Sequence, residues 1–480
     1  MNKTRAAALA FALVSSAVSA HDAPAPSAST GTLLPTLLRI RDAAVASDYA
    51  WQQTAMLADE IGPRLSGSKG AAVAVERVAA ELKALGLDVS LEPVKVPHWV
   101  RGIETATLTQ WQGSTEGLQH RLAITALGGS VATPKKGLRA EVLPVRDYAE
   151  LRSLGREKVA GRIVLFTAAF DERMAVAGQA GAAYGAAVDY RGNGAAKAAA
   201  LGAVAALNRS TGPIGNHLPH TGALRYAEGV PKIPAAAITA EDALLIERLA
   251  AKGPVTMQLT LTPQTLPDAD SFNVIADLRG REKPEEIVIV SGHLDSWDLG
   301  TGAQDDATGV AAAMHVAATL KALGLTPRRT IRVIAWMNEE NGLMGGKTYA
   351  ETHAAELANH VAAIEMDYGA GHPTGFAANV PPTALPLLKP VSETLAGIGA
   401  GIVDYRLNGV GADIGPLNKA GVPGFAPLTD GRDYFTIHHT AADTLDKVNP
   451  RHLAENAAVL SVLAYALAEG EVLPRLAVTP

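Results

Sequence analysis

The sequence predicts an α/β fold in which a mixed sheet is flanked by helices, and three observations support this. After Ser271, short apolar runs of the buried-strand type alternate with helical segments. The chain is 48% hydrophobic and 19% charged, which is an ordinary globular composition. Its 480 residues are enough for two to four structural units, at roughly 100–200 residues per domain.

The alternation is clearest in the second half of the chain. The expected strands are 287–291, 330–337 and 361–366, and the expected helices are 307–323, 342–352, 385–395 and 452–468. Strands that alternate with helices form a sheet whose carboxyl ends carry the chemistry. We therefore look for functional residues directly after these strands.

The first half is expected to add helices over residues 33–85 and a strand over 87–96. Residues 120–260 differ from the rest in composition and pattern. They contain a short apolar strand at 161–166, a long Ala/Gly-rich stretch and a helix near 240–252. These regular elements favour a compact domain over a low-complexity linker. The expected division is one domain built from 21–119 and 262–480, with 120–261 as an inserted domain.

Residues 1–20 have the pattern of a secretory signal peptide. A positive start at Met1–Arg5 is followed by the apolar run Ala6–Val18 and by small residues before His21. The run is shorter than the about 20 residues that span a bilayer, and no other stretch looks transmembrane. We expect cleavage and export to the periplasm or the medium; a membrane-anchoring or buried helix is the alternative.

Composition excludes several classes of function. The chain has no cysteine, so disulfides, thiolate ligands and a cysteine nucleophile are excluded. The formal net charge is -6 and there is no basic run, which argues against nucleic acid as a partner. A metal site would have to use histidine and carboxylate, which suit zinc or a similar divalent ion.

Metal-ligand residue types follow all three expected strands. His293 and Asp295 follow the first strand, Glu339-Glu340 the second and Asp367 the third, while two loops add Asp305-Asp306 and His438-His439. Any one of these alone is weak evidence, since Asp306 could simply cap the following helix. Clustered carboxylates repel one another unless a cation lies between them. The whole set therefore indicates a metal site.

A two-metal site needs one shared carboxylate and further ligands at each ion, with a position left for water. The sequence supplies five candidate ligands, namely His293, Asp305, Glu340, Asp367 and His439. Glu339 lies beside them and is suited to act as a general base on water. Asp295 lies two residues after His293, where it could accept a hydrogen bond from the imidazole and fix its tautomer.

These motifs resemble the co-catalytic zinc peptidases related to bacterial leucyl aminopeptidases and glutamate carboxypeptidases. The segments that carry the resemblance are 292–298, 304–306, 338–342, 365–367 and 438–444. It covers most of the mature chain and implies a secreted exopeptidase with two zinc ions per chain, acting on dipeptides or short peptides with free termini. Asn338 departs from the family, where a small residue is common, but the following glutamate pair is intact.

The resemblance also implies roles. Asp305 would bridge the two zinc ions, His293 with Asp367 would complete one site, and Glu340 with His439 the other. His439 is preferred to His438 because the family's ligand directly precedes the Thr or Ser of its motif.

Beyond the metal ligands, Glu339 would act as general base and then as general acid, and Asp295 would support His293. The insert would be a protease-associated domain and the protein a homodimer.

Three further residues are candidate substrate contacts, and each has a structural alternative. His220 could instead be a turn histidine, Asp413 could cap the following helix, and Tyr434 could be a packing residue.

Other functions remain possible on the same fold. An aminopeptidase acting on longer peptides would use the same ligands. A glutaminyl-cyclase-like enzyme would hold one zinc ion, which the five-ligand set disfavours. A non-catalytic, receptor-like protein would have lost ligands or the base, and none is lost here.

Overall fold

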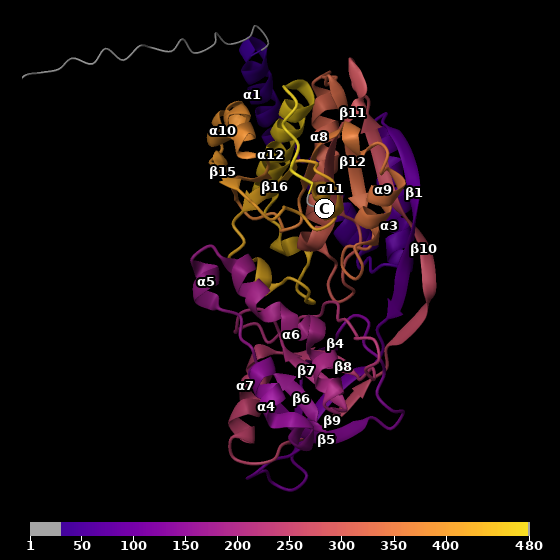
Figure 1. The fold of residues 1–480 in the computed structure, drawn as a ribbon, viewed down its shortest axis with the longest axis vertical. Helices are drawn as coiled ribbons and strands as arrows, with labels where there is room; N and C mark the ends of the chain where they lie inside the picture. The colour runs from indigo at the N-terminus through magenta and orange to yellow at the C-terminus, as the bar shows by residue number, and fades with distance from the viewer. Residues whose placement is uncertain (1–29, 479–480) are drawn as a thin grey trace, which may run out of the picture.

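The computed structural model describes residues 30–478, which form two lobes, each built around its own eight-stranded sheet (Figure 1). The expected signal peptide, residues 1–20, lies outside the described residues. Within residues 30–478, no helix combines the length and the apolar character needed to cross a membrane.

The first sheet is mixed, with the strand order β1-β10-β12-β11-β13-β16-β14-β15. Its central strands β12, β11, β13 and β16 run parallel. The pairs β1–β10, β10–β12 and β14–β16 are antiparallel, and β15 runs parallel to β14 at the edge. The strands are β1 Asp88–Val100, β10 Gln264–Leu278, β11 Lys283–His293, β12 Arg329–Trp336, β13 His360–Glu365, β14 Pro373–Asn379, β15 Ile402–Tyr405 and β16 Gly424–Thr429. The α/β class and the mixed sheet expected from the sequence are confirmed.

Helices cover both faces of this sheet, which explains why the middle of β11, from Ile287 to Val290, is continuously apolar. Val288 and Val290 point into a core shared with α1 Thr30–Ala46, α2 Tyr49–Ala55, α3 Lys69–Ala84, α8 Thr308–Ala322, α10 Lys389–Ala396 and α12 Pro450–Glu469. Ile287 and Ile289 point to the other face, where α9 Met344–Thr352 and α11 Gly415–Lys419 pack. Alternate residues of one strand thus enter two different apolar layers.

Short turns of 3₁₀ or π type connect these elements. They are η1 Met56–Ile61, η2 Ala303–Ala307, η3 Leu357–Asn359, η4 Pro382–Leu388, η5 Tyr434–Thr436 and η6 Leu445–Lys447. The helix expected over 385–395 is wrong at its start, since 382–388 is a 3₁₀ turn and α10 begins only at Lys389. Pro386 lacks the N–H that an α-helix interior needs, whereas Pro390 is tolerated in the first turn of α10.

The second sheet has the order β3-β2-β9-β5-β6-β7-β8-β4. Its strands are β2 Glu104–Gln110, β3 His120–Leu122, β4 Ile124–Ala126, β5 Leu138–Val145, β6 Ile163–Phe166, β7 Ala205–Arg209, β8 Ala235–Ile238 and β9 Thr256–Leu261. Its helices are α4 Tyr148–Val159, α5 Glu172–Val176, α6 Ala180–Ala200 and α7 Ala240–Ala250. Because β2 pairs with both β3 and β9, this sheet begins before the boundary expected at residue 120.

A long antiparallel ribbon and one arginine join the two lobes. The ribbon is formed by β1 and β10, whose pairing extends from Asp88 to Val100 (Figure 1). Arg101 follows it, and its Nε and Nη2 donate to the carboxylate of Asp298 in the first lobe, at 2.8 and 2.6 Å. Its Nη1 donates to the carbonyl of Ala126 in the second lobe, at 2.7 Å. One guanidinium therefore helps to fix how the lobes face each other.

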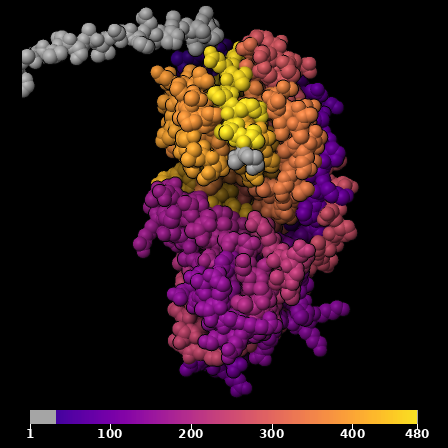
Figure 2. Space-filling model, viewed as in Figure 1, coloured from indigo at the N-terminus to yellow at the C-terminus, as the bar shows by residue number. Residues whose placement is uncertain are grey.

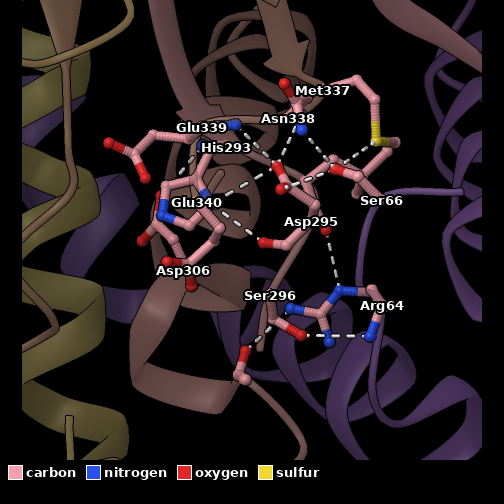
Figure 3. Close-up of polar contacts among 12 residues, drawn as sticks. Arg64, Ser66, His293, Asp295, Ser296, Asp306, Met337, Asn338, Glu339 and Glu340 are labelled. Atoms are coloured by element: carbon pink, nitrogen blue, oxygen red, sulfur yellow. Dashed lines mark hydrogen bonds and ion pairs between the residues drawn. The ribbon is translucent and has the colours of Figure 1, made fainter. Parts of the chain in front are cut away.

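A second arginine organises the loop that follows β11. Arg64 is fully buried, and its guanidinium donates to the main-chain carbonyls of Leu294, Thr301 and Gly302 at 2.9, 2.7 and 2.8 Å (Figure 3). It donates further to the carbonyls of Leu57 and Gly62 in its own segment. Arg64 thus ties the N-terminal helices to the loop that leads from β11 to η2.

We predict that Arg64→Met lowers the free energy of unfolding by about 3–5 kcal/mol. Several buried carbonyls would lose their donor at once, and a hydrogen bond to a charged group is worth about 1.5–3 kcal/mol. Urea unfolding followed by circular dichroism measures the change. The matched control is Arg77→Met, which removes an exposed pair with Glu60 and should cost at most about 1 kcal/mol. Equal stability of the two variants would contradict this role of Arg64.

Candidate metal centre

The fold brings the expected ligand residues to one edge of the first sheet. β11 ends at His293, β12 is followed by Glu339 and Glu340, and β13 is followed by Asp367. Since β11 lies between β12 and β13 and runs parallel to both, their carboxyl ends meet. Two loops complete the set, with Asp305 in η2 and His439 after η5.

The five residues form two groups that share Asp305. His293 Nε2 lies 3.1 Å from Asp305 Oδ1 and 3.1 Å from Asp367 Oδ1. His439 Nε2 lies 3.1 Å from Asp305 Oδ2 and 3.1 Å from Glu340 Oε2. One carboxylate thus presents an oxygen to each of two imidazoles, and each imidazole faces a second carboxylate.

The donor set fits a divalent cation in each group. His293 Nδ1 donates to the main-chain carbonyl of Asp295 at 2.9 Å, so in the neutral imidazole Nε2 carries the lone pair, and it faces two carboxylate oxygens. Lone pairs that face one another repel unless a cation or a proton lies between them. Asp305 Oδ2 and Glu340 Oε1 are buried and accept no hydrogen bond from the described residues. Imidazole nitrogen and carboxylate oxygen are the ligands that zinc takes.

The pKa values of the clustered carboxylates also indicate a site suited to a cation. Burial, followed by the nearby Asp305, raises the pKa of Glu340 to about 7. Burial likewise raises the pKa of Asp367. Asp305 is the exception: burial opposes its ionisation, but the adjacent imidazoles of His293 and His439 hold its pKa well below the usual range. The shared carboxylate is therefore the one that ionises most readily.

Glu339 stands apart from the ligands. Its side chain lines a cleft of about 790 Å³ together with Asp305, Glu340 and His439. Burial, and then the charge of Asp367, raises the pKa of Glu339 well above its ordinary value. A carboxylate with a raised pKa that borders the cleft is suited to accept and return a proton.

The side chain of Asp295 does not take the role expected from the sequence. The contact with the His293 imidazole is made by its main-chain oxygen, and the carboxylate instead accepts the N–H groups of Asn338 and Glu339 at 2.7 and 3.0 Å (Figure 3). Its second oxygen accepts the hydroxyl of Ser66 at 2.9 Å. Asp295 therefore holds the loop that carries Glu339 and Glu340.

Three more carboxylates hold other loops by accepting their main-chain N–H groups. The sequence did not predict these contacts between loops. Asp443 accepts the N–H groups of Gln304 and Asp305, at 2.7 and 3.2 Å. Asp306 accepts that of His293 at 3.1 Å, and also that of Gly309 in the first turn of α8, which agrees with the expected capping.

Glu365 is the third of these carboxylates. It accepts the N–H groups of residues 412, 413 and 414 at 2.9, 3.2 and 2.8 Å. Asp306, Glu365 and Asp443 all lie within or beside the sequence motifs that carry the ligands. This proximity is the only feature of the sequence that could indicate their role.

His438 and His439 both approach Asp305 but differ in their contacts. Their rings stack with centroids 3.6 Å apart, and His438 Nε2 lies 3.4 Å from Asp305 Oδ2. Burial, and then the adjacent His439, depresses the pKa of His438 well below its ordinary value. Only His439 faces two carboxylates at 3.1 Å, which favours it as the ligand.

The three candidate substrate contacts lie in different places. Tyr434 lines the cleft, and burial followed by Asp305 raises its pKa well above the ordinary value. Asp413 is fully buried, neither of its oxygens has a hydrogen-bond partner among the described residues, and it does not cap α11. His220 is buried and is not among the residues that line the cleft.

A second cluster of similar composition needs no cation. His372, His452 and Glu455 lie close enough to share an ion. However, one oxygen of Glu455 accepts from His372 and the other from Arg451, both at 2.9 Å. Its charge is already balanced, unlike that of Asp305 and Glu340.

The cleft lies where the two lobes meet, across the middle of the molecule (Figure 2). Ligand loops of the first lobe form one side and α6 of the second lobe forms the other. A buried cluster of imidazoles and carboxylates that opens into such a cleft at the strand ends of an α/β sheet defines a metallohydrolase.

Comparisons with known proteins specify the family. Peptidase family M28 matches residues 273–464. Carboxypeptidase Q from Bos taurus is 38% identical over 448 residues, which cover 93% of this chain and 91% of that protein. Carboxypeptidase Q from Homo sapiens is 38% identical over 451 residues, with the same coverage. A peptidase M28 precursor from Shewanella amazonensis SB2B has a crystal structure that matches with a TM-score of 0.88 and 38% identity, covering 94% of this chain and 99% of that one.

The chain therefore belongs to peptidase family M28 and is a zinc-dependent metallopeptidase. This confirms the family indicated by the sequence motifs. Because the curated relatives are matched over nine-tenths of their length, the similarity extends through the second lobe as well.

We predict that Asp443→Ala weakens zinc binding by about 10- to 100-fold, the usual effect of losing a residue that orients a metal ligand. The main chain of Asp305 would lose its anchor while all five candidate ligands stay in place. Zinc retained after dialysis against a graded chelator series, measured by plasma mass spectrometry, tests this. Asp446→Ala, a neighbouring exposed carboxylate, is the control and should match the wild type. Unchanged zinc affinity in Asp443→Ala would refute the anchoring role.

We also predict that the chelator-treated protein loses thermal stability as the pH rises from about 5 to about 8. Burial together with Asp305 raises the pKa of Glu340 and of Asp443 to about 7. Such groups bind more protons when folded than when unfolded, so stability falls as the pH rises from the unfolded pKa through the folded one. Zinc should largely remove this slope. Differential scanning calorimetry with and without zinc measures it, and a melting temperature that rises with pH after chelation would contradict the prediction.

Proposed function

We propose that this chain is an exported exopeptidase with two zinc ions, which hydrolyses dipeptides or short peptides with free termini. The observation that carries the proposal is the position of Asp305, with one oxygen toward His293 and the other toward His439, at 3.1 Å each. A shared carboxylate between two imidazoles supports two adjacent ions. The similarity to carboxypeptidase Q supports action on peptides with a free carboxyl terminus.

The proposed ligand groups are His293, Asp305 and Asp367 for one ion, and His439, Asp305 and Glu340 for the other. When bound, the zinc ions would polarise the scissile carbonyl and lower the pKa of a water molecule toward about 7. Glu339 takes the proton from that water as it attacks the peptide carbonyl. The same carboxyl group then returns the proton to the amine that leaves.

The main chain of Glu339, the proposed base, is held in place by a hydrogen bond. Asp295 accepts the N–H of Glu339, so the backbone of the base is fixed while its carboxylate remains at the cleft. Tyr434 also lines the cleft, and its raised pKa keeps the phenol protonated as a hydrogen-bond donor for the substrate. Asp413 and His220 are buried outside the residues that line the cleft, so we do not assign them a direct contact with the substrate.

The domain type of the insert, the cleavage of residues 1–20 and the oligomeric state are also proposed, from the family resemblance and the N-terminal sequence pattern. The insert is of protease-associated type and covers the metal centre, residues 1–20 are cleaved on export, and the enzyme is a homodimer. Intact mass of the secreted protein tests the cleavage, and light scattering at micromolar concentration tests the dimer.

We predict that Glu339→Gln lowers kcat on dipeptides by about 10²- to 10⁴-fold, because the amide cannot accept the proton from water. Zinc content should stay near that of the wild type, since Glu339 is not one of the proposed ligands. Glu351→Gln, an exposed glutamate of α9, is the matched control and should retain full activity. A Glu339→Gln enzyme with wild-type kcat and bound zinc would rule out this base.

The substrate class is tested by a panel of dipeptides, aminoacyl-nitroanilides and N-blocked dipeptides. We expect dipeptides to be the best substrates, with about two zinc ions per chain at full activity. Preference for the nitroanilides or for longer peptides would instead establish an aminopeptidase. One zinc ion with cyclisation of N-terminal glutamine would establish the cyclase, and strong cleavage of N-blocked dipeptides would exclude recognition of the free amine.

A further inference from the structure

We infer that Arg191, on α6 of the inserted domain, binds the free α-carboxylate of the substrate and restricts the enzyme to short peptides with an unblocked C-terminus. The inference rests on the proposed function, because it assigns the substrate-recognising group of the same cleft. No sequence motif singled out Arg191, and it lies in the Ala/Gly-rich stretch far from the ligands in sequence.

The helix that carries Arg191 forms one side of the cleft. α6 lies at the end of the second lobe that faces the first lobe (Figure 1). Tyr184, Val188 and Arg191 of α6 line the cleft, which Glu339 and His439 line from the first lobe. Spacings of three, four and seven residues place these side chains on one helical face. Arg191 therefore shares the cleft with the proposed base and a proposed ligand.

The guanidinium of Arg191 is held in one position. Nη1 donates to the carbonyl of Thr221 at 3.2 Å, and Cζ lies 5.5 Å from the centre of the Tyr184 ring. Gly222 makes room on another side, since a Cβ there would lie only 2.3 Å from Arg191 Cζ. A cation fixed in this way loses little conformational entropy when it binds an anion.

This cation has no anionic partner in the part of the chain that the structure describes. No Asp or Glu forms an ion pair with Arg191, and its Nε has no hydrogen-bond partner. The side chain is nevertheless only 8% exposed, and a buried charge without a counter-charge is costly. Nε itself is enclosed against Gly222, so the Nη1/Nη2 end of the guanidinium is the part that can donate two hydrogen bonds to a carboxylate.

Two other cations line the cleft but are less suited to the role. Lys347 donates its Nζ to the carbonyl of Gly342, and Arg225 is exposed. Exposed charges are screened by water and contribute little to binding. Arg191 is the buried cation among them.

The position of Arg191 also sets the length of the substrate. Its Nη1 lies 3.3 Å from His439 Nδ1, across the imidazole ring from the Nε2 that faces Asp305 and Glu340. One residue of an extended peptide spans about 3.3–3.6 Å. A carboxylate on Arg191 therefore belongs to a chain that ends one or two residues after the scissile bond.

Kinetics on a dipeptide and on the same dipeptide with its C-terminus amidated test the inference. We expect the wild type to prefer the free acid strongly. Arg191→Met should lose about 10²-fold in kcat/KM on the acid, mainly through KM, and little on the amide, because a buried charge pair loses one partner. Arg191→Lys keeps the charge without the two-pronged edge and should show a smaller loss confined to the acid.

The matched control is Lys197→Met, which removes a cation from the exposed side of the same helix and should behave as the wild type. Zinc content is measured for every variant, because Arg191 and His439 Nδ1 both approach the carbonyl of Thr221. An equal loss on acid and amide would show that Arg191 acts through His439, and would overturn carboxylate recognition.

Two outcomes in the wild type separate this inference from the proposed function. Similar kcat/KM on the acid and the amide would overturn the inference and leave the two-zinc peptidase standing. Hydrolysis of neither substrate by enzyme that holds two zinc ions would overturn both.

Discussion

The carboxylate of Asp305, placed between the imidazoles of His293 and His439, is the interaction on which the rest of the structure depends. It is only 4% exposed, and it ionises although burial opposes this. Several more carboxylates crowd around it, and a buried group of negative charges is tolerable only with cations beside it. The proposed metal ions would balance charge that the protein itself leaves unbalanced, so the centre would stabilise the fold as well as supply the proposed chemistry.

The precision of this centre comes from loops that fix one another through their main chains. Four carboxylates accept main-chain N–H groups from other loops of the centre, and these are Asp295, Asp306, Glu365 and Asp443. The second lobe takes part as well, since the N–H of Thr221 donates to the carbonyl of His439 at 2.9 Å. Arg101 holds the two lobes together beside this contact, so the wall that carries Arg191 keeps a defined position over the ligands.

The sequence was sufficient for the features that leave local patterns. Apolar strands alternating with helices predicted the sheet, and ligand residue types after those strands predicted that His293, Glu340 and Asp367 would meet. Features that depend on long-range contacts could not be predicted. Arg64 donates a hydrogen bond to the main chain of Leu294, which is 230 positions away, and no sequence pattern near either residue predicts this contact. The spacing of Asp295 from His293 predicts a contact between the two residues, but it cannot distinguish the main-chain oxygen, which makes the contact, from the carboxylate.

The central claim is that Asp305 joins two metal sites, and anomalous diffraction at the zinc absorption edge tests it most directly. Crystals of the zinc-loaded enzyme should show two anomalous peaks, one beside His293 and Asp367 and one beside His439 and Glu340, each in contact with a different oxygen of Asp305. A single peak, or a second peak held by His438 away from Asp305, would contradict the account.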